Sequence, residues 1–292
     1  MATENIDPRY VDIDMWPTEA AVEAILASQI EAVEALKSQK GALAAATDAA
    51  AERLHGGGRI AYAGAGTSGR IGVQDGVELT PTFGWPEARL VFLMAGGAAA
   101  LMKTQEGAED DRDAARADVA AAEIGAGDVL IGIAASGRTP YVLAAIEAAR
   151  KAGALTIGLS NNAGAPLLDV AEHAILADTG SEVIAGSTRM KAGTAQKVVL
   201  NTLSTAIMLR LGLVHRGLMV NMQVSNAKLL GRGQAMVRDI AGVDQAMAAA
   251  ALAAAGNDIK LAVLLAKGLE VSVAKALLER SEDNLRTALN DA

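Results

Sequence analysis

Residues 59–84 read RIAYAGAGTSGRIGVQDGVELTPTFG and join an apolar run, a glycine-rich turn and a helix. The run at 60–63 is bounded by glycines, which predicts a buried strand of a parallel sheet. Where a chain leaves such a strand and opens a helix, unpaired backbone N–H groups point outward and the helix dipole favours negative charge. Thr67 and Ser68 add hydroxyl donors at this point. The stretch therefore predicts a phosphate-binding turn.

Two other interpretations compete for this turn, a dinucleotide site and a purely structural glycine turn. The glycines fit the G-x-G-x-x-G pattern of a dinucleotide site, but such a site also requires an acidic residue about twenty positions on, at the end of the next strand. Glu78 comes too early to be that acidic residue. The next predicted strand, 89–94, is followed by alanine and glycine and has no acidic residue at its end. A phosphate site is favoured. Thr80, Pro81 and Thr82 are expected to stop the helix and to hold Glu78 at its end.

Further strands are predicted at 129–135, 155–159 and 174–176. The first of these is followed by a second small hydroxylated turn, which contains Ser136 and Thr139 and leads into a helix with proline at its first position. Strands that alternate with helices predict an α/β fold with a parallel sheet, whose ligands bind at the carboxyl ends of the strands.

A third candidate loop lies in residues 181–205. Gly186, Ser187 and Thr188 are expected to open a long helix, whose first turns carry Arg189, Lys191 and Thr194. An ordinary capped helix would explain the hydroxyls but not the clustered cations. The pattern therefore favours a loop that closes over an anion.

An acidic segment at 105–111 is predicted to be helical. Glu106 and Glu109 are three residues apart and would share one helical face, so periodicity does not choose between them as a catalytic carboxylate. A solvated acidic face is the alternative interpretation.

The composition limits the possible partners. The 292 residues carry a formal net charge of −8, which argues against nucleic acid or an anionic membrane as a partner. There is no cysteine, and the three histidines are far apart, so a metal site is not expected. The polar, acidic N-terminus lacks the features of a secretory signal, and no apolar run reaches the ~18 to 20 residues of a membrane span. A cytoplasmic protein is expected.

We expect three regions along the chain. Residues 1–54 comprise an extended arm, whose ordering could depend on a partner subunit, and helices that begin after an N-cap at Thr18. Residues 55–215 contain the sheet and the candidate site. Residues 216–292 form a small helical module, whose first helix is predicted at 219–237.

Four segments of the sequence carry a resemblance to a known family. GAGTSGRIGVQDGVELTPTFG, QEGAED, IAASGRTPYV and GSTRMKAGTAQKVVLN together resemble the N-acetylmuramic acid 6-phosphate etherases of the sugar isomerase (SIS) phosphosugar-binding superfamily. The resemblance covers about residue 50 to the end. It implies a three-layer αβα sandwich with a five-stranded parallel sheet, a homodimer, and no metal or organic cofactor.

The resemblance also assigns roles to residues. It implies catalytic glutamates at Glu78 and Glu109, and so selects Glu109 over Glu106. The phosphate-binding hydroxyls it implies are Thr67, Ser68, Ser136, Thr139 and Ser187. The reaction implied is cleavage of the D-lactyl ether of N-acetylmuramate 6-phosphate in cell-wall recycling. This sequence departs from the usual pattern at Val77, Leu79 and Thr80, which affects the expected shape of the loop around Glu78.

Two other functions are compatible with phosphosugar turns. A regulator similar to the glucokinase regulatory protein would bind a phosphosugar without turnover, but such regulators typically carry two SIS domains. An aldose-ketose isomerase would also use a carboxylate, but it would not be expected to contain GSTRMKAGTAQK. The etherase is therefore the favoured expectation.

Overall fold

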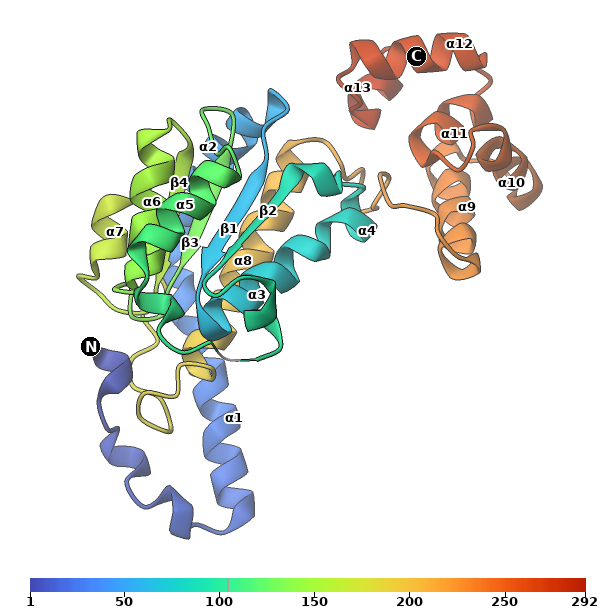
Figure 1. Cartoon of the computed structure of the whole chain (residues 1–292). Coiled ribbons are helices and arrows are strands. Elements are labelled where there is room, and N and C mark those ends of the chain that lie inside the picture. The colour runs from blue at the N-terminus through green and yellow to red at the C-terminus, as the bar shows by residue number, and fades with distance from the viewer. Residues whose placement is uncertain (104) are drawn as a thin grey trace. The chain divides into compact units, whose positions relative to one another are not determined.

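The computed structural model of the chain describes residues 1–103 and 105–292. The described residues form a parallel sheet with the order β2-β1-β3-β4-β5 (Figure 1). Its strands are β1 (Ile60–Gly64), β2 (Leu90–Met94), β3 (Val129–Ile133), β4 (Leu155–Ser160) and β5 (His173–Leu176). The predicted α/β class with a five-stranded parallel sheet is confirmed. β3 ends two residues earlier than predicted because the chain turns at Ala134, whose carbonyl accepts the Gly137 N–H at 2.9 Å.

Helices cover both faces of the sheet, because alternate side chains of a strand point to opposite faces. Ala61, Ala63 and Leu130 pack against the layer formed by α5 (Arg112–Ala121), α6 (Pro140–Lys151) and α7 (Pro166–Val170). The opposite face is covered by α2 (Lys40–His55), which packs on β3, β4 and β5, and by α3 (Gly66–Val77). In α3, Gly72 lies against Tyr62 and Ile133. The result is the expected three-layer arrangement (Figure 1).

The N-terminal arm is not extended as predicted. It folds into the short 3-10 helices η1 (Ala2–Glu4), η2 (Pro8–Tyr10) and η3 (Ile13–Met15). Asp7 caps η2 by accepting the Arg9 N–H at 3.0 Å, and Arg9 in turn binds Glu31 of α1 (Thr18–Glu34) at 2.9 Å. The N-cap of α1 is Pro17, and Thr18 is the first helical residue. Local capping therefore folds the arm into turns.

The chain forms two compact units, Met1–Gly76 with Ala88–Thr205, and Val77–Glu87 with Ala206–Ala292. The first contains the sheet together with η4 (Ala35–Gln39), η5 (Glu87–Arg89), η6 (Ala98–Leu101), η7 (Ala108–Asp110) and most of α8 (Lys191–Arg210). The second contains α4 (Leu79–Phe83), α9 (Ala227–Ala241), α10 (Gln245–Ala254), α11 (Ile259–Ala266), α12 (Val271–Arg280) and α13 (Leu285–Asn290).

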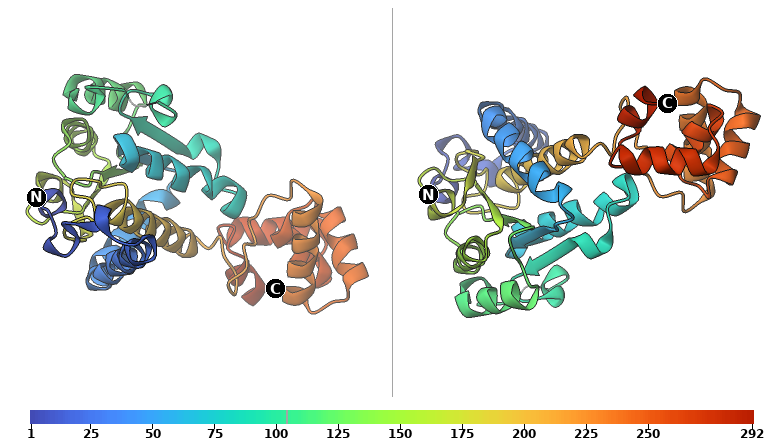
Figure 2. Two further views of the ribbon diagram at one scale, coloured as in Figure 1. Left: turned by 90° about the horizontal axis from the view of Figure 1, so that it is seen from below. Right: turned by 90° about the horizontal axis from the view of Figure 1, so that it is seen from above.

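The second unit has its own apolar core among α9 to α13, which appear in orange and red in Figure 2. Side chains cap its helices: Asn226, Asp244 and Asp258 accept the backbone N–H groups three residues on at 2.8 to 3.0 Å. The Asn226 cap starts α9 at Ala227, so the helix predicted from residue 219 begins eight residues later.

Across 1–103 and 105–292, no helix is both long enough and apolar enough to span a membrane.

A partly buried ion pair joins the starts of two central strands. Arg59 precedes β1 and Asp128 precedes β3, and the guanidinium binds the carboxylate at 2.7 and 3.1 Å. The backbone N–H groups of Arg59 and Gly125 also donate to Asp128, at 2.9 and 3.0 Å. Burial alone would raise the pKa of the Asp128 carboxyl, but the hydrogen bonds from Arg59 and Gly125 outweigh it and lower this pKa below its usual value.

This ion pair predicts how stability depends on pH. Because the pKa of Asp128 is lower in the folded chain than in the unfolded chain, its stabilisation is present above the unfolded pKa of about 3.9 and is lost as the pH falls further. Asp128→Asn should reduce the free energy of unfolding at pH 7 by about 1 to 3 kcal/mol. It should also weaken the acid-side loss of stability, measured by urea unfolding at a series of pH values. An unchanged acid slope in the variant would contradict this role for the pair.

Candidate active site

The predicted phosphate-binding turns lie at one edge of the sheet. β1 and β3 are neighbours, and Gly64 at the end of β1 pairs with Ile133 at the end of β3. The chain leaves β1 toward β2 on one side and leaves β3 toward β4 on the other. This is a topological switch point, where crevices form outside the carboxyl ends of parallel strands. The turns that contain Ser68 and Ser136 therefore emerge next to each other.

The first turn depends on a close approach between Gly64 and Gly69. A Cβ on Gly64 would lie 2.6 Å from the Gly69 Cα, and a Cβ on Gly69 would lie 2.8 Å from the Gly64 carbonyl oxygen. Only glycine fits at both positions. This packing brings the first turn of α3 over the end of β1, with Thr67 half-buried and Ser68 9% exposed. The hydroxyls of both residues accompany the unpaired N–H groups of the helix N-terminus.

The second turn leaves hydroxyl groups available near the start of α6. Ser136 is half-buried, and its Oγ accepts the Arg138 N–H at 3.1 Å. Thr139 is the N-cap residue of α6, but its side chain makes no capping hydrogen bond, and Pro140 follows at the first helical position. The Ser136 O–H and the Thr139 hydroxyl can thus both be directed toward a ligand.

The third loop differs from the prediction. Residues 186–188 do not open the helix, which begins at Lys191 instead. The fully buried carboxylate of Glu182 accepts the N–H groups of Lys191 and Ala192 at 2.8 and 2.9 Å. The N-terminus of α8 is therefore capped by the protein's own carboxylate. Ser187 is half-buried in the preceding loop and offers its side-chain hydroxyl.

Two side chains of this segment, those of Lys191 and Thr194, form contacts inside the fold. Lys191 is 3% exposed, and its Nζ lies 3.3 Å from the Glu31 carboxylate of α1. The Thr194 hydroxyl donates to Gln29, also on α1. The expectation that Lys191 and Thr194 close over an anion is wrong, because both side chains fix α1 to α8. Arg189 remains exposed.

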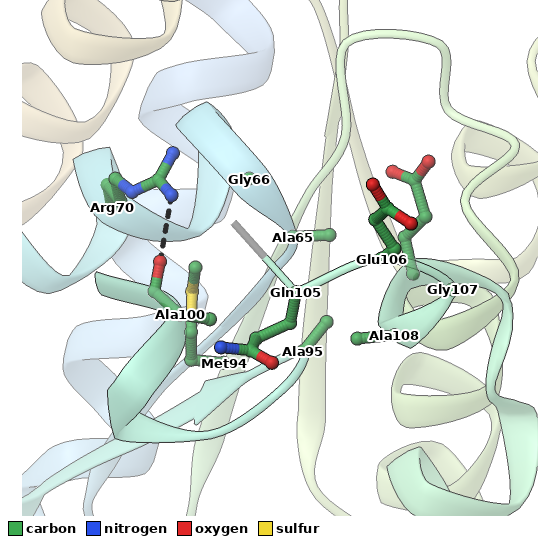
Figure 3. A pocket seen from close by; sticks show the side chains of 11 residues that line it. Ala65, Gly66, Arg70, Met94, Ala95, Ala100, Gln105, Glu106, Gly107 and Ala108 are labelled. Carbon is green, nitrogen blue, oxygen red and sulfur yellow. Dashed lines mark hydrogen bonds between the residues drawn. The ribbon is translucent and has the colours of Figure 1, made fainter. Parts of the chain in front are cut away.

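A cavity of about 270 Å³ lies beside the first turn. Its walls come from the ends of β1 and β2, from η6 and from the acidic segment (Figure 3). The lining residues are Ala65, Gly66, Arg70, Met94, Ala95, Ala100, Gln105, Glu106, Gly107, Ala108 and Glu109. Arg70 and Glu106 lie on opposite sides of it (Figure 3). Arg70 donates to the carbonyls of Ala100 and Leu101 at 2.8 and 2.9 Å, which fixes η6 against α3.

Glu106 and Glu109 both line this cavity, but they do not share a helical face as predicted. Gly107 adopts a left-handed φ of 73°, which interrupts the helical path, and Glu109 belongs to the short η7. The following helix, α5, begins only at Arg112, because Asp111 caps it by accepting the Ala114 N–H at 2.8 Å. Glu109 is exposed at the cavity wall.

Among the predicted site residues, all of which the structure describes, Glu78 belongs to the second compact unit and the others to the first. Glu78 is exposed and is the N-cap residue of α4, directly after α3 ends at Val77. As predicted, α3 stops before residues 80–82 and leaves Glu78 at its end, although these three residues lie inside the short helix α4. Pro81 has no N–H to donate to the carbonyl four residues earlier, which is consistent with a helix break just before it.

Sequence reasoning gave no role to a buried polar group on α3. Asp75 is 1% exposed and accepts hydrogen bonds from the Tyr62 hydroxyl at 2.9 Å and from Asn201 Nδ2 at 2.6 Å. Burial raises the pKa of Asp75, although these donors act in the opposite direction. The signal in the sequence was an aspartate on the inward face of the helix, between Gly72 and Gly76.

In the part of the chain that the structure describes, no group of three His, Cys, Asp or Glu side chains is placed to hold a metal ion.

Comparison with known proteins gives three kinds of match. The model of the glucokinase regulatory protein N-terminal SIS domain matches residues 42–150. A solved protein from E. coli CFT073, determined as a complex, has a TM-score of 0.52 and 17% sequence identity, and the match covers 70% of this chain and 97% of that one. This likeness supports the fold alone.

Curated relatives match along the whole chain. A protein named N-acetylmuramic acid 6-phosphate etherase from Deinococcus radiodurans is 49% identical, and the match covers 99% of this chain and 95% of the relative. Proteins of the same name from Rubrobacter xylanophilus and Salmonella choleraesuis are 43% and 42% identical, with at least 96% of each relative covered. Identity at this level over the full length shows the family: the chain belongs to the N-acetylmuramic acid 6-phosphate etherases.

Proposed function

We propose that this protein is an N-acetylmuramic acid 6-phosphate etherase, a carbon-oxygen lyase that releases D-lactate from N-acetylmuramate 6-phosphate and leaves N-acetylglucosamine 6-phosphate. The observation that carries the proposal is the 49% identity to a protein of that name over 99% of the chain. The charge of a phosphorylated substrate keeps it inside the cell membrane. The proposal therefore includes a cytoplasmic location and a role in recycling cell-wall amino sugars.

The substrate phosphate is assigned to the hydroxyl-bearing turns. Thr67 and Ser68 follow β1, Ser136 and Thr139 follow β3, and Ser187 lies in the loop before α8. Hydroxyl donors and the N–H groups of a helix N-terminus suit a phosphate, because hydrogen bonds to a charged acceptor are stronger than those between neutral groups. The adjacency of β1 and β3 supports this assignment, since it puts the first two turns side by side.

The chemistry assigned to the site needs two carboxylates. An ether is a poor leaving group, but opening the sugar ring to its aldehyde makes the C2 proton acidic. Glu78 is proposed to take that proton and to pass it to the lactate oxygen as the C3–O bond breaks. Glu109 is proposed to activate the water that then adds to C3 of the unsaturated intermediate, while C2 regains a proton. The position of Glu109 on the wall of the cavity beside Gly66 supports its role.

The second candidate function is a phosphosugar-sensing regulator. The observation in its favour is the match of residues 42–150 to the SIS domain of a regulatory protein. That match covers little more than a third of the chain, whereas the etherase relatives cover nearly all of it. A regulator would bind the phosphosugar and release no D-lactate.

The proposed reaction predicts where solvent atoms enter the products. Incubation of the purified protein with N-acetylmuramate 6-phosphate in ¹⁸O-water and D₂O should release D-lactate that keeps the original ether oxygen. The sugar product should carry ¹⁸O on C3 and deuterium on C2, because elimination precedes hydration; mass spectrometry measures both labels. Heavy oxygen in the lactate hydroxyl would mean that the other C–O bond had broken. Binding without lactate release would favour the regulator.

The two glutamates should differ in the step that each one impairs. Glu78→Gln should lower turnover by about 10² to 10⁴, the usual contribution of general acid-base catalysis, with little change in phosphosugar affinity. Glu109→Gln should slow hydration more than elimination, so the unsaturated sugar should accumulate and be seen by mass spectrometry. Glu106→Gln is the matched control, because it removes the same charge from the same cavity wall. If Glu106→Gln also slowed hydration and let the unsaturated sugar accumulate to the same extent, the assignment of the water-activating role to Glu109 would be contradicted.

A homodimer is part of the proposal. Val22, Leu26, Ile30 and Val33 of α1 repeat at helical spacing and are 48%, 60%, 64% and 41% exposed. Four large apolar side chains on one helical face are costly to leave in water. In a two-fold symmetric dimer the same patch meets itself, so one apolar face suffices for both subunits.

The apolar face of α1 predicts the effect of charges placed on it. Leu26→Arg combined with Ile30→Arg should shift the protein from dimer to monomer in light scattering at micromolar concentration. Met102→Gln, a change at another highly exposed apolar side chain, should leave the mass unchanged. A wild-type protein that is monomeric and fully active on dilution would exclude the dimer.

A further inference from the structure

Thr3 is fully buried although it is the third residue of the chain. Its N–H donates to Asn162 Oδ1 at 3.4 Å, and its hydroxyl accepts from Asn162 Nδ2 at 3.0 Å. Thr3 and Asn162 thus form two hydrogen bonds between residues 159 positions apart in the sequence. The start of the chain is thereby fixed to the segment that follows β4.

Asn162 connects this pair to the second hydroxyl-bearing turn. It is 3% exposed, and besides Thr3 its Nδ2 also donates to the carbonyl of Ala135 at 2.9 Å. Ala135 directly precedes Ser136. Both hydrogens of the Asn162 amide are therefore engaged, one by the arm and one by the turn after β3.

Thr3 connects the pair to the third loop. Its carbonyl accepts the Gly186 N–H at 2.9 Å, and Gly186 directly precedes Ser187. The Glu4 carboxylate also lies close to Gly186, since its Oε2 is 3.0 Å from the position that a Cβ on Gly186 would occupy. A continuous path of hydrogen bonds thus runs from the Ser136 turn through Asn162 and Thr3 to the Ser187 loop.

We propose that Thr3 and Asn162 are positioning residues, which set the placement of the Ser187 hydroxyl relative to the Ser136 turn for binding a sugar phosphate. This inference rests on the proposed function, which assigns both serines to the same phosphate. Two donors on separate loops bind one anion well only if their spacing is fixed before the ligand arrives. The buried Thr3–Asn162 pair supplies that constraint, because its loss would leave an amide hydrogen of Asn162 without a partner in a buried position.

The test compares Thr3→Val, which keeps the shape of the side chain but removes the hydroxyl, with Thr3→Ser, which keeps the hydroxyl. The probe is N-acetylglucosamine 6-phosphate, titrated calorimetrically so that no turnover is required. Thr3→Val should weaken binding of the probe by roughly three- to tenfold. This is the loss expected for one hydrogen bond, since each 1.4 kcal/mol changes the dissociation constant about tenfold. Thr3→Ser should restore wild-type affinity. Thr3→Ala replaces Thr3→Val should that variant fail to fold.

A double-mutant cycle separates positioning from general destabilisation. If Thr3 acts through the third loop, Thr3→Val should weaken binding much less in a Ser187→Ala background than in the wild-type protein. Hydrogen exchange should also be faster in residues 184–190 of Thr3→Val. Full additivity of the two changes, or wild-type affinity in Thr3→Val while Ser187→Ala binds weakly, would overturn the inference and leave the proposed function intact. A wild-type protein without affinity for the probe would overturn both.

Discussion

The close approach of Gly64 and Gly69 is the contact on which the candidate site depends. Because neither residue has a side chain, the end of β1 and the first turn of α3 pack with their backbones in contact. This contact directs the N–H groups of α3 outward at the switch point between β1 and β3. A Cβ at either position would force the helix away from the strand, and both Ser68 and the cavity beside Gly66 would move with it.

Polar contacts between distant segments then join the elements of the sheet and its helices to one another. Arg59 and Asp128 join the starts of β1 and β3, and Asp75 receives hydrogen bonds from β1 and from α8. Glu31 of α1 holds Lys191 at the start of α8. Glu31 is exposed, but each of the other groups is at least partly buried and has a polar partner, which offsets the cost of removing it from water. The strands and helices that carry the candidate site are therefore joined by side chains that are far apart in the sequence.

The sequence predicts what depends on local pattern and misses what depends on distant partners. β2 is predicted with its observed end at Met94, because an apolar run bounded by glycine is a local signal. The start of α8 is misplaced because its cap, Glu182, lies nine residues before Lys191, and neither helical spacing nor a capping box relates the two. The burial of Lys191 depends on Glu31, 160 residues away. A left-handed glycine, Gly107, separates two glutamates that periodicity puts on one face.

The second compact unit is assembled from two separate pieces of the chain, residues 77–87 and 206–292. Leu79 and Phe83 of the first piece are buried in the folded protein, yet the rest of their unit is translated about 120 residues later. At roughly 5 to 20 residues per second, the ribosome needs about 6 to 24 seconds to reach the second piece after finishing the first, and about 10 to 41 seconds to finish it. The apolar side chains next to Glu78 therefore lack their native partners until the second piece of their unit has been synthesised.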